Sequence, residues 1–204
     1  MKLYFAPHAC SLSPHIVLRE LGLPFALVRV DNRTKRTAEG GSFLDVNPKG
    51  YVAALALDNG EVLTEGPAIL QYLADLKPEA GLAPPNGSWA RVRLQEMLNF
   101  ISTEIHAGCS PLFDRELPAR VTTQVEARLF KRLDLLAATL AEREYVLGAT
   151  FGVADAYLYT VLGWLPGFAI DIARWPALAR FMARIGQRDA VRAALAAEAA
   201  SAPA

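Results

Sequence analysis

Cys10 is the residue of this 204-residue sequence whose position points most directly to chemistry. Ser13 is a favoured N-cap residue and Pro14 suits a first helical turn, so a helix is expected to begin directly after the cysteine. The positive end of a helix and its unpaired N–H groups stabilise a thiolate over a thiol, and the hydroxyls of Ser11 and Ser13 can donate hydrogen bonds to the sulfur. The alternative is a cysteine packed as a small apolar side chain.

Cys10 has no second thiol near it in the sequence, because the other cysteine of the chain is Cys109. In the segment Cys10-Ser11-Leu12-Ser13, a serine stands where redox Cys-x-x-Cys segments have their second cysteine. Such a site can bind a thiol ligand or form a mixed disulfide, but it needs an external thiol to complete a redox cycle. Two cysteines also make a poor disulfide framework for a chain of this length.

A second candidate lies at Thr64-Glu65-Gly66-Pro67, where a predicted strand ends and a predicted helix begins. Backbone N–H groups converge at such a junction and can bind an anionic group. The carboxylate of Glu65 can bind an ammonium group, so a ligand with a carboxylate and an amino group on one carbon would satisfy both. The alternative is that Thr64 and Glu65 only cap the helix.

A polar stripe forms the third candidate. Asn99, Thr103 and His106 are spaced four and three residues apart, which places them on one face of a helix. The ring of a neutral His106 can form a hydrogen bond with a thiol or a thiolate. The alternative is a solvated helix surface. The opposite face carries apolar residues at helical spacing: Leu94, Leu98, Ile101 and Ile105.

The first 77 residues alternate short strands with helices. Gly22 is suited to end the first helix, and Asn59-Gly60 is a strong hairpin signal. The order β-α-β followed by β-β-α, with a parallel first pair and an antiparallel second pair, is that of a thioredoxin-like mixed sheet. The pattern predicts strands at Lys2–Phe5, Phe25–Val30, Val52–Leu57 and Glu61–Leu63, and helices at Pro14–Gly22 and Pro67–Leu76.

Residues 78–87 form the predicted linker, because their prolines and glycines support neither a helix nor a central strand. This divides the chain into an α/β domain at residues 1–77 and an all-α domain, a helical bundle, at residues 88–204. The tail at residues 199–204 is expected to fray. Helices are predicted at Trp89–Ala107, Ala119–Ala141, Val153–Trp164, Trp175–Gly186 and Asp189–Ala199.

Composition excludes several classes of function. Lys plus Arg and Asp plus Glu both number 21, so no global field favours nucleic acid or an anionic membrane. Charged residues interrupt every apolar stretch before the roughly 18 residues that would span a bilayer. The N-terminal apolar run is too short for a signal peptide, so we expect a cytoplasmic protein. His8 and His15 have no partner at metal-ligand spacing, and no metal site is expected.

The sequence resembles the glutathione S-transferases of the bacterial beta class over nearly its whole length. The motifs that carry the resemblance are Lys2-Leu3-Tyr4, Ala9-Cys10-Ser11-Leu12-Ser13-Pro14-His15, Val46-Asn47-Pro48-Lys49-Gly50-Tyr51-Val52, Leu63-Thr64-Glu65-Gly66-Pro67-Ala68-Ile69, Leu98-Asn99-Phe100-Ile101-Ser102-Thr103-Glu104-Ile105-His106 and Val153-Ala154-Asp155-Ala156-Tyr157. It implies a homodimeric detoxification enzyme that uses glutathione as cosubstrate, requires no metal, and conjugates the glutathione thiolate to small electrophilic compounds.

The same resemblance implies a role for each site residue. Cys10 and His106 would be catalytic, both beside the glutathione sulfur. The backbone of Val52 would pair with the cysteinyl part of glutathione, and Glu65 and Gly66 would hold its γ-glutamyl end. The remaining residues would bind glutathione more peripherally: Ser11 as a hydrogen-bond donor, Lys35 at the glycyl carboxylate, Asn99 in the cleft, and Thr103 and Glu104 in part from the partner subunit.

Two departures from the family pattern stand out. The family has a cis proline after Val52, where this chain has Ala53, so either the bond stays cis or the loop relaxes. The family has a Ser or Thr N-cap three residues before Asp155, where this chain has Gly152. Glycine is also accepted as an N-cap residue, at a small cost in helix stability. Thiol-disulfide exchange through Cys10, a glutathione-dependent reductase or dehalogenase, and a non-catalytic ligand-binding protein remain as alternatives.

Overall fold

The computed structural model describes residues 1–201, which form two compact units. The first unit contains Met1–Ala83 together with the segment that begins at Gly186, and the second contains Pro84–Ile185. The last helix, which the sequence pattern grouped with the helical half, therefore packs in the first unit. The predicted fold class is confirmed: a thioredoxin-like α/β fold and a helical fold occur in one chain.

The first unit is built on a four-stranded mixed sheet with the strand order β2-β1-β3-β4. Strand β1 pairs in parallel with β2 and antiparallel with β3, and β3 pairs antiparallel with β4. The predicted βαβ unit and hairpin are thus both present, although the second and third strands are shorter than expected and the fourth begins one residue later. The strands are β1 (Lys2–Phe5), β2 (Ala26–Arg29), β3 (Ala54–Ala56) and β4 (Val62–Thr64).

The predicted third strand is shorter than expected at both ends, Ala54–Ala56 instead of Val52–Leu57, and the Val52–Ala53 peptide bond before it is cis. The chain thus keeps the cis bond although alanine stands in place of proline. The paired part of β3 begins only at Ala54, opposite Tyr4. Gly60, with φ of 89°, allows the following hairpin turn, which is closed by the hydrogen bond from Leu57 N–H to the Glu61 carbonyl.

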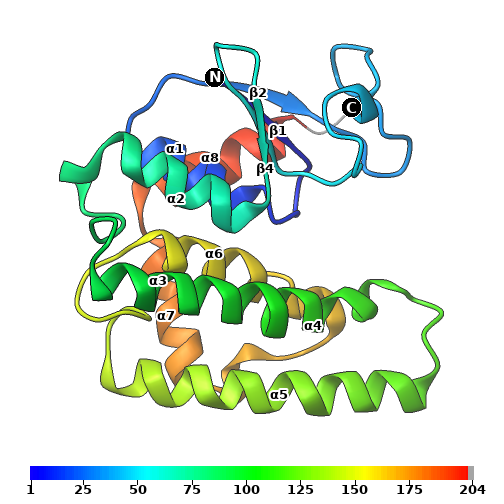
Figure 1. Cartoon of the computed structure of the whole chain (residues 1–204). Helices are drawn as coiled ribbons and strands as arrows, with labels where there is room; N and C mark the ends of the chain where they lie inside the picture. Colours follow the sequence, from blue (N-terminus) through cyan, green and yellow to red (C-terminus); the bar gives the residue numbers. More distant parts are fainter. Residues whose placement is uncertain (202–204) are drawn as a thin grey trace. The chain divides into compact units, whose positions relative to one another are not determined.

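Three helices cover one face of this sheet (Figure 1): α1 (Leu12–Glu20), α2 (Gly66–Leu76) and α8 (Asp189–Ala200). Side chains alternate along β1, so Leu3 and Phe5 are buried toward one face while Tyr4 belongs to a cluster on the other. That second cluster also contains Val28, Val30, Phe43, Val52 and Ala54.

Helix α1 begins earlier than predicted, since Ser11 rather than Ser13 occupies its N-cap position. The N–H groups of Leu12 and Ser13 already donate to the carbonyls of Ala9 and Cys10, so the helical turn starts before the predicted cap. Ser11 makes no side-chain cap hydrogen bond. Cys10 consequently lies immediately before the N-cap of α1.

In the second unit, α3 (Trp89–Phe100) continues into a π-helical stretch at Ile101–His106 and ends in α4 (Ala107–Cys109). The predicted helix is therefore present, but with an interruption that periodicity alone does not reveal. The apolar face of this helix is buried, with Leu94, Leu98, Ile101 and Ile105 at most 1% exposed. The other helices of this unit are α5 (Ala119–Glu142), α6 (Val153–Leu162) and α7 (Pro176–Gly186).

Helix α6 has Gly152 at its N-cap position, and Asp155 supplies the capping carboxylate. The two carboxylate oxygens of the buried Asp155 accept hydrogen bonds from Val146 N–H and Gly152 N–H, each at 2.9 Å. The aspartate therefore satisfies the backbone N–H of the N-cap residue and that of Val146, while the N–H of Asp155 itself donates to the Gly152 carbonyl.

Short 3-10 helices occupy Phe43–Asp45, Pro78–Ala80, Ser110–Phe113, Leu165–Phe168 and Ile172–Arg174. The tail at residues 199–204 was expected to fray, but α8 continues to Ala200, and residues 202–204 lie outside the described part of the chain. Within residues 1–201, no helix combines the length and apolar character needed to cross a bilayer.

Candidate functional site

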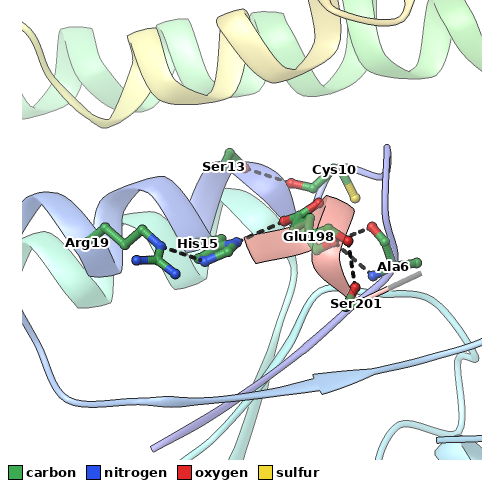
Figure 2. A network of polar contacts seen from close by, with 8 residues as sticks. Ala6, Cys10, Ser13, His15, Arg19, Glu198 and Ser201 are labelled. Atoms are coloured by element: carbon green, nitrogen blue, oxygen red, sulfur yellow. Dashed lines mark hydrogen bonds and ion pairs between the residues drawn. The ribbon is translucent and has the colours of Figure 1, made fainter. Parts of the chain in front are cut away.

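Cys10 lies in the loop between β1 and α1, and its half-buried thiol donates to the Val52 carbonyl oxygen at 3.3 Å. The expectation that Ser11 and Ser13 donate to the sulfur is wrong, because both hydroxyls donate to backbone carbonyls. Ser13 Oγ donates to the Cys10 carbonyl at 2.8 Å, as Figure 2 shows, and the buried Ser11 Oγ donates to the Ala6 carbonyl at 3.2 Å. The two serines therefore fix the loop that carries the cysteine.

The structure also corrects the expected protonation state of Cys10. Burial raises the pKa of the Cys10 thiol from its ordinary value of 9.0 to about 11, and the backbone N–H groups of Ala53 and Cys10 offset this only in part. Desolvation of the charged form thus outweighs the helix N-terminus. At neutral pH the cysteine is a thiol, which can donate one weak hydrogen bond.

Glu65 stands at the N-cap of α2 in a backbone conformation that side chains rarely adopt, with φ of 69°. Backbone strain of this kind concentrates at functional sites. Its carboxylate accepts a hydrogen bond from Lys49 Nζ at 2.6 Å, and the same ammonium group donates to Thr64 Oγ1 at 3.2 Å. Lys49 is a residue that the motif contained but that sequence reasoning gave no role.

The backbone N–H groups of Val52 and Gly66 donate no hydrogen bond to any residue in the range 1–201. Gly66 opens α2, and no atom lies within 4 Å of the position that a Cβ would occupy there. Val52 precedes the paired part of β3. Each N–H is therefore a donor that a ligand can use, one just before β3 and one at the start of α2.

Lys35 has φ of 56°, and its ammonium group lies 5.5 Å from the centre of the Tyr51 ring. Its backbone is held at both ends, because its N–H donates to the Asp31 carbonyl at 2.8 Å and its carbonyl accepts from Phe43 N–H at 2.7 Å. Tyr51 itself is 74% exposed. The arrangement fixes the base of the lysine while its charged end stays near an exposed aromatic ring.

The polar residues of the second unit differ in how they are held. Asn99 is exposed and its carbonyl accepts a hydrogen bond from Thr103 Oγ1 at 3.0 Å. Glu104 pairs with Arg132 of α5 within the same chain. His106, at the end of the π-helical stretch, is half-buried, and its Nδ1 lies 2.6 Å from the Tyr157 hydroxyl oxygen.

Burial lowers the pKa of His106 below its ordinary value of 6.5, so the ring is neutral at pH 7. A row of aromatic rings continues from it. The centres of the His106 and Trp164 rings are 4.9 Å apart, those of Trp164 and Phe113 are 5.3 Å apart, and those of Phe113 and Phe168 are 4.9 Å apart. Phe113 is 56% exposed, which leaves part of this row open to a ligand.

The predicted site residues thus form two groups, one in each unit. Cys10 contacts Val52 within the first unit, where Glu65 and Lys35 each have a defined partner. In the second unit His106 joins Tyr157 and Trp164, two residues whose importance no spacing in the sequence indicates. Across residues 1–201, no three His, Cys, Asp or Glu side chains form a group that could hold a metal ion.

Comparison with known proteins agrees with this geometry. Family models of the glutathione S-transferase N-terminal and C-terminal domains match residues 9–76 and 100–189. The chain is 44% identical to the glutathione S-transferase GstA of Escherichia coli O157:H7, over 97% of this chain and 98% of that one. This chain therefore belongs to the glutathione S-transferase family.

Two solved structures are similar over nearly their full length. One is a sphingomonad glutathione S-transferase complexed with glutathione, with 47% identity, a TM-score of 0.95 and coverage of 98% of this chain and 99% of that one. The other is a bacterial beta-class glutathione S-transferase from Sphingomonas chungbukensis, with 45% identity, a TM-score of 0.94 and coverage of 97% and 98%. Both have the two-domain architecture that the sequence predicts.

Proposed function

We propose that this glutathione S-transferase, as a beta-class enzyme, conjugates the thiolate of glutathione to small electrophilic compounds. The glutathione sulfur attacks an electrophilic carbon, a carbon–sulfur bond forms, and the leaving group departs with its electron pair. The observation that carries the proposal is the Cys10 thiol held against the Val52 carbonyl, beside the unpaired N–H of Val52. A thiol donor and an unpaired backbone N–H just before a strand suit the cysteinyl part of the tripeptide.

We assign the glutathione contacts of the first unit as follows. The Val52 backbone pairs with the cysteinyl residue in a strand-like manner. The γ-glutamyl carboxylate binds Gly66 N–H, and its ammonium group binds Glu65, where it takes a place that Lys49 now holds. That ion pair is exposed and so costs little to rearrange. Lys35 binds the glycyl carboxylate, and the contribution of Ser11 is to hold the loop of Cys10.

Cys10 acts in this proposal as a hydrogen-bond donor to the glutathione thiolate and not as a nucleophile. Its raised pKa keeps the proton on the cysteine, and a protonated sulfur beside a thiolate stabilises the negative charge. Mixed-disulfide exchange through Cys10 is the second candidate activity. Ser13 stands where a resolving cysteine would be. A mixed disulfide at Cys10 therefore waits for an external thiol, which favours this activity.

We further propose that His106 forms a hydrogen bond with the glutathione sulfur and that Asn99, Thr103 and Glu104 line the same cleft, the last two in part from the partner subunit of a homodimer. The partly exposed aromatic row at Phe113 and Trp164 suits an aromatic electrophile. Along the sequence, the proposed domains are residues 1–77 and 88–204 with a linker at 78–87, and α8 of the second segment packs in the first unit. The proposed physiological role of the enzyme is the detoxification of small molecules in the cytoplasm.

Substitution of Cys10 separates the two activities. Cys10→Ser keeps a hydrogen-bond donor and is expected to retain most conjugation of an activated aryl halide, while Cys10→Ala loses about tenfold. Both variants are expected to lose exchange with a mixed disulfide of glutathione. Cys109→Ala, which alters the fully buried second thiol, is the control for general perturbation.

Two results would contradict parts of this proposal. If Cys10→Ala loses only the exchange activity, Cys10 has no role in conjugation. If the unmodified protein is retained on immobilised glutathione yet turns over neither aryl halides nor disulfides, it is a ligand-binding protein and the proposed function is wrong.

A further inference from the structure

Tyr157 of α6 contacts the histidine that the proposed function uses. Its hydroxyl oxygen lies 2.6 Å from His106 Nδ1, and its ring centre lies 5.8 Å from that of His106 in an edge-to-face arrangement. The tyrosine is 2% exposed, so its hydroxyl is held inside the second unit, where α6 packs beside the end of α3 (Figure 1). Nothing in the sequence pattern pairs these two residues.

The direction of this hydrogen bond follows from the chemistry of the two groups. The lone pair of a neutral imidazole is a far stronger base than a phenol oxygen, so the arrangement with the phenol O–H as donor is favoured. A Tyr157 hydroxyl that donates to His106 Nδ1 leaves the ring proton of His106 on Nε2.

We propose that Tyr157 is a positioning residue that fixes the proton of His106 on Nε2 and orients the ring, so that Nε2–H is presented as a hydrogen-bond donor. The catalytic consequence rests on the proposed function: a donor at Nε2 stabilises a thiolate, whereas the other tautomer would present a lone pair and repel it. Tyr157 acts on the reaction only through His106.

The surroundings of His106 explain why a single hydroxyl can hold the ring. Trp164 packs edge-on against the imidazole with ring centres 4.9 Å apart and an interplanar angle of 72°. This contact restricts translation of the ring, but it does not distinguish the two flipped orientations because a carbon and a nitrogen have nearly the same shape. The Tyr157 hydroxyl is the group that distinguishes Nδ1 from the ring carbon.

Nitrogen-15 NMR of the histidine rings in the glutathione-free protein tests the tautomer directly. The chain has three histidines, so substitution of His106 by Gln assigns its signals. At pH 7 to 8 we expect His106 Nε2 in the protonated range and Nδ1 in the unprotonated range. A protonated Nδ1 in the unmodified protein overturns the proposal, and this reading does not depend on any enzymatic activity.

Tyr157→Phe keeps the ring and removes only the hydroxyl, and it is expected to return His106 to a mixture of tautomers. Tyr159→Phe is the matched control, because it removes a hydroxyl two residues along the same helix and is expected to leave the His106 signals unchanged. An unchanged His106 tautomer in a folded Tyr157→Phe variant would also overturn the proposal.

A double-mutant cycle then connects the tautomer to catalysis. We expect Tyr157→Phe to lower kcat for conjugation about three- to tenfold with little change in KM for glutathione. In a His106→Ala background the same substitution is expected to have no further effect. Equal losses in both backgrounds would show that Tyr157 acts by supporting the fold. Absence of conjugation in the unmodified protein would instead contradict the proposed function and leave the NMR result standing.

Discussion

The Cys10 thiol donates a hydrogen bond to the Val52 carbonyl, 42 residues away in sequence, with 3.3 Å between sulfur and oxygen. This contact joins the start of α1 to the residue that precedes the cis peptide bond. A thiolate has no hydrogen to donate, so the contact is consistent with the protonated thiol that burial favours by raising the pKa of Cys10. The reactivity of Cys10 without glutathione follows from this state.

Cys10 should react slowly with iodoacetamide at neutral pH, and its rate should rise with pH up to about 11. The reason is that the thiolate is the reacting form and that burial raises the pKa of Cys10 to about 11. Mass spectrometry of the Cys109→Ala variant at a series of pH values measures this rate on a single thiol. A rate that is already constant between pH 7 and 8 would mean that the helix N-terminus dominates over burial.

Both cysteines should make the protein less stable in alkali. Their pKa values in the folded state, about 11 for Cys10 and about 12 for Cys109, lie above the ordinary value of 9.0. Each thiol therefore contributes stability that is fully present below pH 9 and is lost as the pH rises toward 11 to 12. Urea unfolding between pH 8 and pH 11 should show a shallower decline for Cys10→Ala and Cys109→Ala than for the unmodified protein. Parallel curves would contradict this assignment.

Glu65→Gln should raise KM for glutathione roughly tenfold, because it removes the charge that binds the γ-glutamyl ammonium group. The free energy of unfolding should change by less than about 1 kcal/mol, since the Lys49 ion pair that is lost is exposed. Initial rates at varied glutathione concentration measure the effect. Glu39→Gln is the matched control, as it removes an exposed carboxylate paired with Lys2 in the same unit. Equal KM values for both variants would exclude Glu65 from the site.

Glu198→Ala should lower the free energy of unfolding by about 3 kcal/mol, because it leaves a buried polar partner unsatisfied. Glu198 of α8 lies 2.9 Å from His15 Nδ1, and His15 Nε2 accepts from Arg19 Nε at 2.9 Å, as Figure 2 shows. Both members of the first pair are buried. Asp189→Ala removes the exposed ion pair of the same helix with Arg192 and should cost less than about 1 kcal/mol. Similar urea midpoints for the two variants would contradict this assignment.

Local patterns were enough to predict most of the fold. The alternation at Lys2–Phe5, the Asn59-Gly60 turn and the apolar spacing of α3 correctly predicted the sheet, the hairpin and the buried helix face. Local patterns were insufficient at two places. The π-helical stretch at Ile101–His106 differs from an α-helix in its hydrogen bonds, and α8 packs with α1 through contacts between residues more than 170 positions apart.

The candidate site was predictable in its residue types but not in its electrostatics. The position of Cys10 before a helix indicated a stabilised thiolate, but burial, which depends on the tertiary structure, has the larger effect on its pKa. The partner of His106 was missed because Tyr157 lies 51 residues further along the chain, in another helix. Lys49 was missed because its partner Glu65 belongs to a separate motif.

The return of α8 to the first unit has a consequence for synthesis of the chain. A ribosome produces the strands and α1 before the second unit, but the helix that carries Glu198 is made only after the whole second unit. The buried His15 therefore stays without its carboxylate partner until the second unit has been synthesised. The first unit to be made is thus the last to be finished, and the second unit, continuous in sequence, is free to fold in the interval.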